Sequence, residues 1–260
     1  MKKIVLLMIA AIFAIAGTAT AKDWKKIRMS TEGAYPPFNY KTPDGTLTGF
    51  DVDIANALCD YLKVECVWQT TAWEGTIPGL LARKYDASIA SMSITEERKK
   101  KVAFTDKYYT TPAKLAAHEK FIERVLAGDI DPKDLKIGVQ KETIHDRFAS
   151  HMWGKKSTIV RYGTQDQVFL DMKSGRLDLI IAASVAISDG FLKLKGNEKY
   201  QFVGPSYNDP KWFGNGAGIA INKKNQDLVE LFNKAIAGIR ANGTYKKIQD
   251  KYFDFDVYGD

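Results

Sequence analysis

The sequence is poor in the residues from which many metal and catalytic sites are built. Its 260 residues include two cysteines and three histidines. These numbers exclude a disulfide-dense scaffold, a four-cysteine zinc site and a histidine-rich metal centre. The sequence also contains no Gly-x-Ser-x-Gly nucleophile elbow and no His-Glu-x-x-His zinc motif. It therefore lacks the usual signatures of serine hydrolases and zinc proteases.

Long hydrophobic runs are absent after the N-terminus. Lys2 and Lys3 open the chain, residues 4–17 are apolar, and Ala19-Thr20-Ala21 follows with small side chains. This pattern is typical of a secretory signal peptide, so we predict that residues 1–21 are removed by cleavage after Ala21. A membrane anchor is the alternative, but the apolar run is shorter than the roughly 20 residues that a spanning helix needs.

Export would place the two cysteines in an oxidising compartment. Cys59 and Cys66 enclose only a short loop. We predict a local disulfide that joins the end of a helix to the next strand, with two buried thiols as the alternative. A loop this small should stabilise the fold by only ~2 kcal/mol in the chain-entropy description.

The net positive charge does not indicate a nucleic-acid-binding surface. A formal net charge of +7 raises nucleic acid and anionic membranes as candidates. The basic runs are residues 99–101 and Lys223-Lys224, and acidic residues lie near both. Neither run interleaves with aromatic side chains as a nucleic-acid surface does. We interpret both runs as solvated faces.

The histidines do not have the spacing of metal ligands, and the glycine-rich segment does not have the pattern of a dinucleotide-binding loop. His118, His145 and His151 share no metal-ligand spacing, so we interpret them as solvated surface residues. Residues 214–218 are rich in glycine but lead into residues 219–221, which have a strand pattern. A dinucleotide-binding loop must open a helix instead. No cofactor and no metal ion are expected.

Strand and helix patterns alternate along the chain. Strands are predicted at residues 27–31, 64–70, 86–91, 136–140, 158–161 and 178–182. Helices are predicted at residues 76–84, 144–152 and 166–174, from a cap at Asn225 to a stop at Asn242-Gly243, and along Phe50, Ile54, Leu58 and Leu62. Residues 115–134 are polar and irregular. The alternation predicts an α/β fold with parallel strands.

Two similar segments indicate an internal repeat. Leu81-Ala82-Arg83-Lys84-Tyr85-Asp86 and Lys173-Ser174-Gly175-Arg176-Leu177-Asp178 both enter an apolar strand. Two α/β units of similar size would fit this chain length.

Polar and aromatic residues near predicted strand ends form a candidate ligand site. Ser91-Met92-Ser93-Ile94-Thr95 and then Arg98 follow a strand, at the edge where α/β folds bind small ligands. Arg98 can form a bidentate pair with a carboxylate. Glu32 and Tyr35 follow the first strand and Trp73 the second, and a carboxylate between aromatic faces attracts an organic cation. Each residue alone has a plain structural explanation, but together they predict one pocket with two charged ends.

A set of collinear motifs runs through the chain after the predicted signal peptide. The motifs are Glu32-Gly33-Ala34-Tyr35-Pro36-Pro37-Phe38, Gly49-Phe50-Asp51-Val52-Asp53, residues 85–98, Phe104-Thr105-Asp106-x-Tyr108-Tyr109, Ile137-Gly138-Val139-Gln140, Gly175-Arg176-Leu177-Asp178 and residues 252–259. This set resembles the periplasmic amino-acid-binding proteins of ABC importers, solute-binding protein family 3. The lysine/arginine/ornithine and histidine members look most similar, and residues 143–148 resemble the arginine/ornithine branch.

The resemblance implies a type II-like periplasmic-binding-protein fold. Two α/β lobes, joined by two hinge strands, would close on the ligand. Lobe 1 would take residues 25–111 and 207–260, and lobe 2 residues 115–203. The protein would act in the periplasm as a monomer and deliver its ligand to an ABC permease in the inner membrane. The cysteine pair also matches cysteines of the members that bind basic amino acids.

The resemblance assigns roles at the amino-acid end of the ligand. Arg98 would bind the α-carboxylate, helped by Ser93 and Thr143, and Ser91 would meet the α-amino group. At the other end, Glu32 would face the distal cation, where the lysine/arginine/ornithine members carry an aspartate. The other predicted ligand-binding residues are Tyr35 and Trp73, which would enclose the aliphatic stem, with Ala90, Met92, Gln140, Ile144 and Ser184.

One position departs from the family pattern. The family places an aspartate in lobe 2 that pairs with the α-ammonium, and the aligned residue here is Ala183, with no acid in residues 181–185. An unpaired buried ammonium is unfavourable. Either Ser91, Ser184 or water substitutes, with weaker binding, or the ligand amine carries a substituent. Some opine-binding relatives also lack this aspartate and share Thr31-Glu32-Gly33.

These observations leave three functional hypotheses. The leading one is a receptor for a cationic amino acid, with arginine favoured over ornithine and lysine. The first alternative is a receptor for an opine or another N-substituted arginine derivative. The second is an enzyme similar to cyclohexadienyl dehydratase, which needs an acid in lobe 2 that residues 182–186 do not supply.

Overall fold

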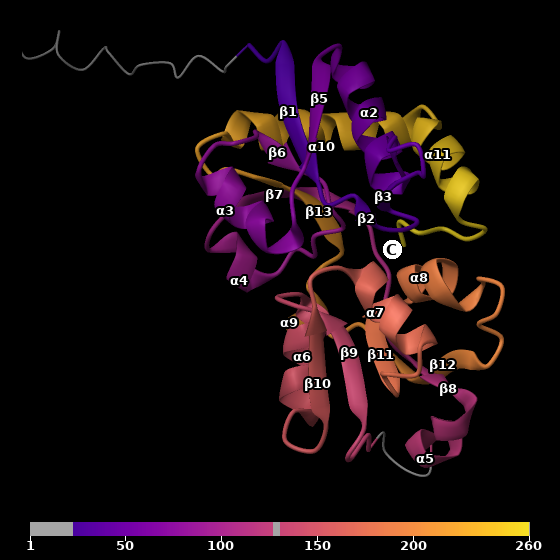
Figure 1. Cartoon of the computed structure of the whole chain (residues 1–260). Helices are drawn as coiled ribbons and strands as arrows, with labels where there is room; N and C mark the ends of the chain where they lie inside the picture. Colours follow the sequence, from indigo (N-terminus) through magenta and orange to yellow (C-terminus); the bar gives the residue numbers. More distant parts are fainter. Residues whose placement is uncertain (1–22, 127–130, 260) are drawn as a thin grey trace, which may run out of the picture.

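Two α/β units lie one above the other in the computed structural model, which describes residues 23–126 and 131–259 (Figure 1). The predicted signal peptide, residues 1–21, lies outside the described residues. Within those ranges no helix combines the length and the apolar character that a membrane crossing requires.

The first unit, lobe 1, is built on a five-stranded sheet. The strand order is β5 (Glu65–Thr70), β1 (Lys26–Thr31), β6 (Ala87–Ser88), β13 (Ala217–Ile221) and β7 (Ala103–Tyr109). The first three strands are parallel, and β13 runs antiparallel to both of its neighbours. Its helical segments are α2 (Phe50–Leu62), η1 (Trp73–Gly75), α3 (Thr76–Leu81), α4 (Glu96–Lys99), α10 (Gln226–Ala241) and α11 (Thr244–Tyr252). A small sheet of β2 (Ala34–Tyr35), β3 (Asn39–Lys41) and β4 (Leu47–Thr48) follows β1.

The second unit, lobe 2, repeats this plan. Its strand order is β10 (Thr158–Tyr162), β9 (Lys136–Gln140), β11 (Leu179–Ala183), β8 (Ala113–His118) and β12 (Tyr200–Tyr207). Again three parallel strands meet an antiparallel fourth. Its helical segments are η2 (Glu119–Phe121), α5 (Ile122–Leu126), α6 (Ile144–Trp153), α7 (Gln165–Lys173), α8 (Ser184–Ile187) and η3 (Ser188–Leu192).

The chain passes between the two sheets twice. It leaves lobe 1 between β7 and β8 and returns from β12 through α9 (Pro210–Phe213) to β13. The last helices, α10 and α11, then pack on lobe 1, so that both ends of the described chain belong to the same lobe (Figure 1). The α/β two-lobe architecture expected from the sequence is confirmed.

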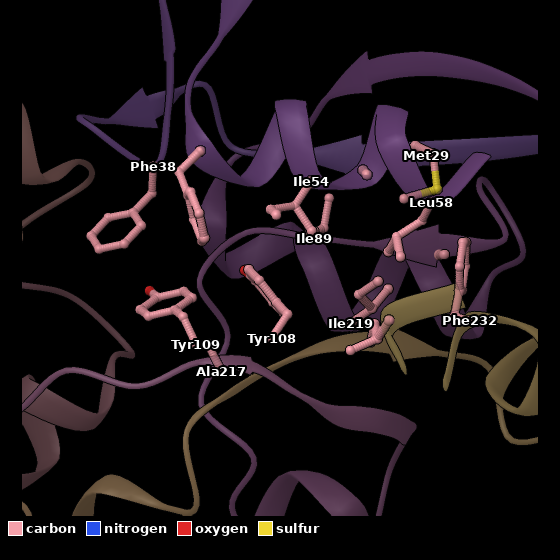
Figure 2. Close-up of a cluster of buried hydrophobic side chains, with 14 of the residues drawn as sticks. Met29, Phe38, Ile54, Leu58, Ile89, Tyr108, Tyr109, Ala217, Ile219 and Phe232 are labelled. Carbon is pink, nitrogen blue, oxygen red and sulfur yellow. The ribbon is translucent and has the colours of Figure 1, made fainter. Parts of the chain in front are cut away.

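The predicted core faces of two helices are buried in lobe 1. Phe50, Ile54 and Leu58 of α2 are fully buried, and Leu62 packs at the edge of the same cluster. Phe232 of α10 belongs to the same core, because α10 packs directly against α2 (Figure 2). Spacings of three and four residues on one helix face therefore gave the correct buried side.

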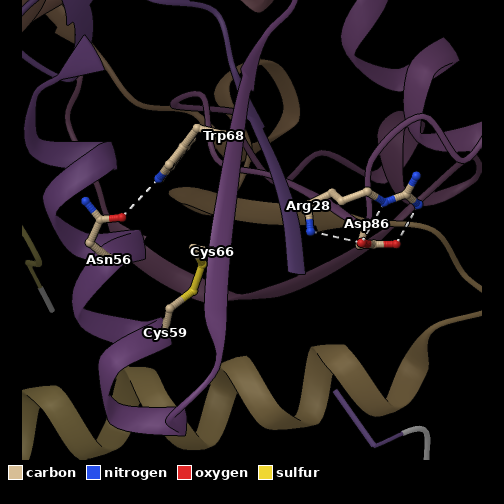
Figure 3. The surroundings of a disulfide bond; sticks show 6 residues. All are labelled: Arg28, Asn56, Cys59, Cys66, Trp68 and Asp86. Atoms are coloured by element: carbon tan, nitrogen blue, oxygen red, sulfur yellow. Dashed lines mark hydrogen bonds and ion pairs between the residues drawn. A yellow bond between two sulfur atoms is a disulfide. The ribbon is translucent and has the colours of Figure 1, made fainter. Parts of the chain in front are cut away.

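The internal repeat is visible at equivalent strands. Asp86 enters β6, and its backbone N–H and carboxylate bond the backbone of Arg28 at 2.9 and 2.9 Å (Figure 3). Asp178 enters β11 and makes the same two bonds to Lys136, at 3.0 and 2.8 Å. Each aspartate joins the central strand of its sheet to the parallel strand beside it, β6 to β1 and β11 to β9, which explains why the two segments are similar.

The predicted disulfide is present. Cys59 lies near the end of α2 and Cys66 on β5, with their Cα atoms 6.1 Å apart (Figure 3). Asn56 and Trp68 tie the same helix to the same strand, because Trp68 Nε1 donates to Asn56 Oδ1 at 3.0 Å. The alternative of two buried thiols is wrong.

Several local predictions were wrong. Residues 115–134 were expected to be irregular, yet they include most of β8 and all of α5. The strand expected at residues 86–91 is only Ala87–Ser88, because Ser91 adopts a left-handed backbone with a φ of 53°. Asn225 precedes α10 as expected, but its side chain makes no capping hydrogen bond. Gly243, with a φ of 79°, does supply the left-handed residue after that helix.

Candidate functional site

A cavity lies between the two lobes. Including its opening to solvent it measures about 370 Å³. Each of its walls comes from the loop after a parallel strand, the position where α/β sheets bind ligands. The residues that line it are Glu32, Tyr35, Trp73, Ala90, Ser91, Ser93 and Arg98 from lobe 1, and Gln140, Thr143, Ile144 and His145 from lobe 2.

Arg98 forms the basic end of the cavity. Thr95 caps the short helix α4 by accepting from the N–H of Arg98, which places the guanidinium at the cavity. Nη1 of Arg98 donates to the carbonyl of Ser93 at 3.1 Å, and the guanidinium lies 5.1 Å from the centre of the Trp73 ring. No carboxylate pairs with Arg98 among the described residues, and burial lowers its pKa to about 10. It is therefore available to a carboxylate ligand.

Glu32 forms the acidic end. It directly follows β1, and its Oε1 accepts a hydrogen bond from Nε2 of Gln140 in lobe 2 at 2.6 Å. Burial raises the pKa of the Glu32 carboxyl to about 7, and the nearby charges of Asp166 and Glu74 raise it further against the effect of the Gln140 bond. A cation bound here would favour the ionised form.

Aromatic side chains form the walls between the charged ends. Tyr35 is buried and stacks on Phe38, with ring centres 5.7 Å apart. Trp73 also lines the cavity, and its Nε1 donates to the carbonyl of Glu142 in lobe 2 at 3.3 Å. Flat apolar walls of this kind suit an aliphatic stem between two polar groups.

The lobes touch each other around the cavity. Lys141 of lobe 2 pairs with Glu74 of lobe 1 at 2.7 Å, and Arg147 pairs with Glu97. Together with the Glu32–Gln140 and Trp73–Glu142 bonds, these contacts describe a closed arrangement.

Two predicted site residues do not line the cavity. Met92 is buried in a separate cluster with Leu80, Tyr85 and Val102, because it faces away from the cavity between Ser91 and Ser93. Ser184 begins α8 and borders a different crevice, toward the C-terminal segment. The other predicted ligand-binding residues all reach the cavity.

His145 is a site residue that the sequence analysis missed. It was expected to be a solvated surface histidine, yet it is half-buried and lines the cavity from the first turn of α6. Burial and then the charge of Arg98 lower its pKa to about 3, so the ring is neutral at ordinary pH. Its position directly after Thr143 and Ile144 was the available signal. Of the other two histidines, His151 is exposed and His118 is half-buried against Tyr200.

A second cavity of about 500 Å³ adjoins the first on the side of the interlobe crossings. Ser91, Ser93 and His145 border both cavities. Ala183, at the end of β11, lies in the wall of the second one. No acidic side chain lines it in the described part of the chain, so the gap left by Ala183 is not filled by another residue's carboxylate.

The site shows no sign of a metal centre. Over residues 23–126 and 131–259, no group of three or more histidine, cysteine, aspartate or glutamate residues is placed to hold a metal ion. The chemistry of the cavity is that of charge pairing and stacking.

Residues 27–255 match the bacterial extracellular solute-binding proteins, family 3. The chain belongs to this family. It is 48% identical to the L-arginine-binding protein of Pseudomonas aeruginosa, over 100% of this chain and 99% of that protein. It is 36% identical to the lysine/arginine/ornithine-binding periplasmic protein of Escherichia coli, over 100% and 99% of the two chains.

Solved structures agree with this assignment. A periplasmic binding protein of Salmonella typhimurium described as having high arginine specificity superposes with a TM-score of 0.77 at 28% sequence identity. The match covers 88% of this chain and 99% of that one. The protein is thus a solute-binding protein and not an enzyme, as the sequence analysis expected.

Proposed function

We propose that this solute-binding protein binds a cationic amino acid between its lobes, with arginine favoured and with ornithine and lysine as further ligands. The observation that carries the proposal is that Glu32 and Arg98, which have opposite charges, line one cavity together with the aromatic side chains of Tyr35 and Trp73. Neither charge has a partner of opposite charge among the described residues. A zwitterion with a second, distal positive charge would satisfy both.

We assign the site residues as follows. Arg98, with Ser93 and Thr143, binds the α-carboxylate, and Glu32 with Gln140 binds the distal cation. The stem lies along Tyr35 and the other apolar walls, which are formed by Trp73, Ala90 and Ile144. The names of the relatives support this choice of ligand, since two of them refer to arginine.

The ligand is tested by a thermal-shift panel of arginine, ornithine, lysine, histidine, octopine and nopaline. A ligand that binds only the folded protein raises its melting temperature. Arginine should give the largest shift, and Arg98→Ala should remove the shift for every carboxylate ligand. Glu230→Gln, on the exposed side of α10, is a control that should behave as the wild type. A panel in which no cationic amino acid shifts the wild type contradicts the proposal.

A second candidate class is an opine or another N-substituted arginine derivative. The second cavity favours it, because Ala183 lies in its wall where a substituent on the α-nitrogen would be directed. Larger shifts with octopine or nopaline than with arginine would make this the better assignment.

We also propose how the protein is placed and used. Residues 1–21 direct export and are cleaved after Ala21, so that the mature monomer acts in the periplasm. Lobe 1, residues 25–111 and 207–260, and lobe 2, residues 115–203, close on the ligand, and the closed form docks on an ABC permease. The periplasmic names of several relatives support this setting. N-terminal sequencing of the exported protein checks the cleavage, with Lys22 as the expected first residue.

A further inference from the structure

The proposed ligand has a third charge for which the cavity shows no obvious partner. Arg98 accounts for the α-carboxylate and Glu32 for the distal cation, while Ala183 stands where a carboxylate for the α-ammonium was expected. The second cavity beside Ala183 has no acidic lining residue within the described chain. An ammonium removed from water without a partner is strongly disfavoured.

A buried carboxylate lies one side chain behind the cavity. Asp51, in the first turn of α2, has no exposed surface. Its Oδ2 accepts from the hydroxyl of Ser91 at 3.0 Å and from Nδ2 of Asn39 at 2.8 Å, and its Oδ1 accepts from the hydroxyl of Tyr108 at 2.7 Å. Ser91 is the one of these three that lines the cavity.

Asp51 has hydrogen bonds but no cation. These three donors are neutral groups, and no lysine, arginine or histidine pairs with Asp51 within residues 23–126 and 131–259. A buried charge without a counter-charge is costly, so such groups are usually paired. Burial accordingly raises the pKa of Asp51 to about 6, against the effect of its hydrogen bonds. The free protein thus holds an anion that lacks its cation.

Ser91 is held in one orientation by the same network. Its backbone is left-handed, with a φ of 53°, which is unusual for a residue other than glycine. Its N–H donates to the hydroxyl of Tyr108 at 3.1 Å, and its own hydroxyl donates to Asp51. Because the hydroxyl proton is committed to Asp51, the oxygen of Ser91 can only accept from a group in the cavity.

The geometry of an α-amino acid brings the ammonium to this place. The carboxylate and the ammonium are attached to the same carbon atom, so an ammonium must lie close to Arg98 and Ser93. Ser91 is two residues from Ser93 and lines both cavities with it, whereas Glu32 lines only the first cavity, where it bonds Gln140.

We propose that Asp51 is the counter-charge of the ligand's α-ammonium and acts through the Ser91 hydroxyl, in place of the carboxylate that position 183 lacks. The ammonium donates to Ser91 Oγ, and the Ser91 hydroxyl donates to Asp51. The positive charge of the ligand is thus neutralised by the Asp51 carboxylate through the hydroxyl group between them. Asp51 is in this role a positioning residue, because it does not touch the ligand. The proposal deepens the proposed function and rests on it.

A pair of ligands separates this role from a merely structural one. Arginine carries the α-ammonium, and 5-guanidinopentanoate has the same carboxylate, stem and guanidinium without it. Calorimetry should show that Asp51→Asn weakens arginine binding about 10- to 100-fold, the range for a hydrogen bond to a charged group. Binding of 5-guanidinopentanoate should change less than about threefold, because that ligand has no group at Ser91 to lose.

Asp53→Asn is the matched control. It makes the same change in the same helix turn, but Asp53 bonds Lys251 and Tyr252 on the other side and does not reach the cavity. Both ligands should bind this variant as they bind the wild type. Ser91→Ala removes the hydroxyl oxygen between the ligand and Asp51, and it should cause the same selective loss of arginine affinity. If Asp51→Asn does not fold, the Ser91→Ala variant tests the proposal by itself.

Equal weakening of both ligands in Asp51→Asn and in Ser91→Ala would mean that the network only shapes the pocket, and would overturn the proposal. Unchanged arginine binding in both variants would overturn it as well. If the wild type bound neither ligand, the proposed function itself would fail, and that result is distinct because it needs no variant.

Discussion

At the scale of single residues, the site is a set of charges that lack partners inside the protein. Glu32, Arg98 and Asp51 are each wholly or partly buried, and none of them forms a salt bridge within the described residues. Most buried charges in proteins are paired. The most direct explanation is that a ligand with the complementary pattern of charges completes each pair.

The raised pKa of Glu32 predicts how arginine binding depends on pH. With a pKa of about 7 in the free protein, Glu32 is largely protonated at pH 6, and binding a cation then requires loss of that proton. Affinity for arginine should be constant above about pH 8 and fall progressively as the pH drops through 7. Calorimetry from pH 8.5 to 5.5 measures this.

Glu32→Gln is the control for that pH profile. The variant should bind arginine more weakly at pH 8 and should lose the decline centred near pH 7. Only the smaller decline below about pH 6 that Asp51 contributes should remain. An unchanged profile would mean that Glu32 does not face the cation.

The two charged residues that line the cavity could be predicted from the sequence. The residues whose roles depend on tertiary contacts could not. Glu32 directly follows β1 and Arg98 lies on α4, after β6, and both stand in motifs that resemble a known family, so their positions could be inferred. Asp51 and His145 owe their roles to contacts with segments far away in the chain, such as Tyr108 and Arg98. Such contacts are set by the tertiary fold and leave no local pattern.

At the scale of elements, the sequence pattern predicted the three parallel strands of each sheet but missed the antiparallel strands β7, β8 and β12. β8 reads Ala-Lys-Leu-Ala-Ala-His and has no β-branched residue, yet it pairs with β11 on one side and β12 on the other. Pairing on both edges makes it a strand despite its weak propensity. β6 ends early because Ser91 turns into the site.

The disulfide between α2 and β5 should contribute to the stability of the fold but not to ligand binding. Cys59, which is bonded to Cys66, lies near the C-terminal end of α2, whereas Asp51 lies in its first turn. Replacing both, Cys59→Ser with Cys66→Ser, should lower the free energy of unfolding by ~2 kcal/mol, as expected for a small loop. Urea unfolding measures this, and reduced wild-type protein should unfold as the double variant does.

Arginine affinity should stay within about twofold of the wild type in that double variant. A large loss of affinity would mean that the disulfide holds the N-terminal turn of α2 and its carboxylate in place.

At the scale of the whole molecule, two similar lobes meet around the ligand. Their equivalent aspartates, Asp86 and Asp178, fix each sheet in the same way. The contacts between the lobes include polar bonds at the rim of the cavity, and Ala183, Val185 and Ala186 of lobe 2 also pack against the apolar cluster of lobe 1. A rim of this kind can open without unfolding either lobe.

The ion pair between the lobes at the cavity mouth should slow the dissociation of the ligand. Lys141→Ala removes the pair with Glu74 across the cavity mouth and should speed arginine dissociation about two- to fivefold, the value of an exposed ion pair. Stopped-flow fluorescence can measure the rate. Lys156→Ala breaks a pair with Asp131 within lobe 2 and should leave the rate unchanged. Equal rates in both variants would show that this pair does not hold the lobes closed.

The central claim is that Glu32 recognises the distal positive charge of an amino acid held by Arg98. Calorimetric titration of the wild type and Glu32→Gln with arginine and with citrulline, its uncharged counterpart, tests it most directly. We predict that the wild type binds arginine at least about tenfold more tightly than citrulline and that Glu32→Gln loses most of this preference. Equal binding of the two ligands by the wild type, or a preference that survives in Glu32→Gln, would contradict the claim.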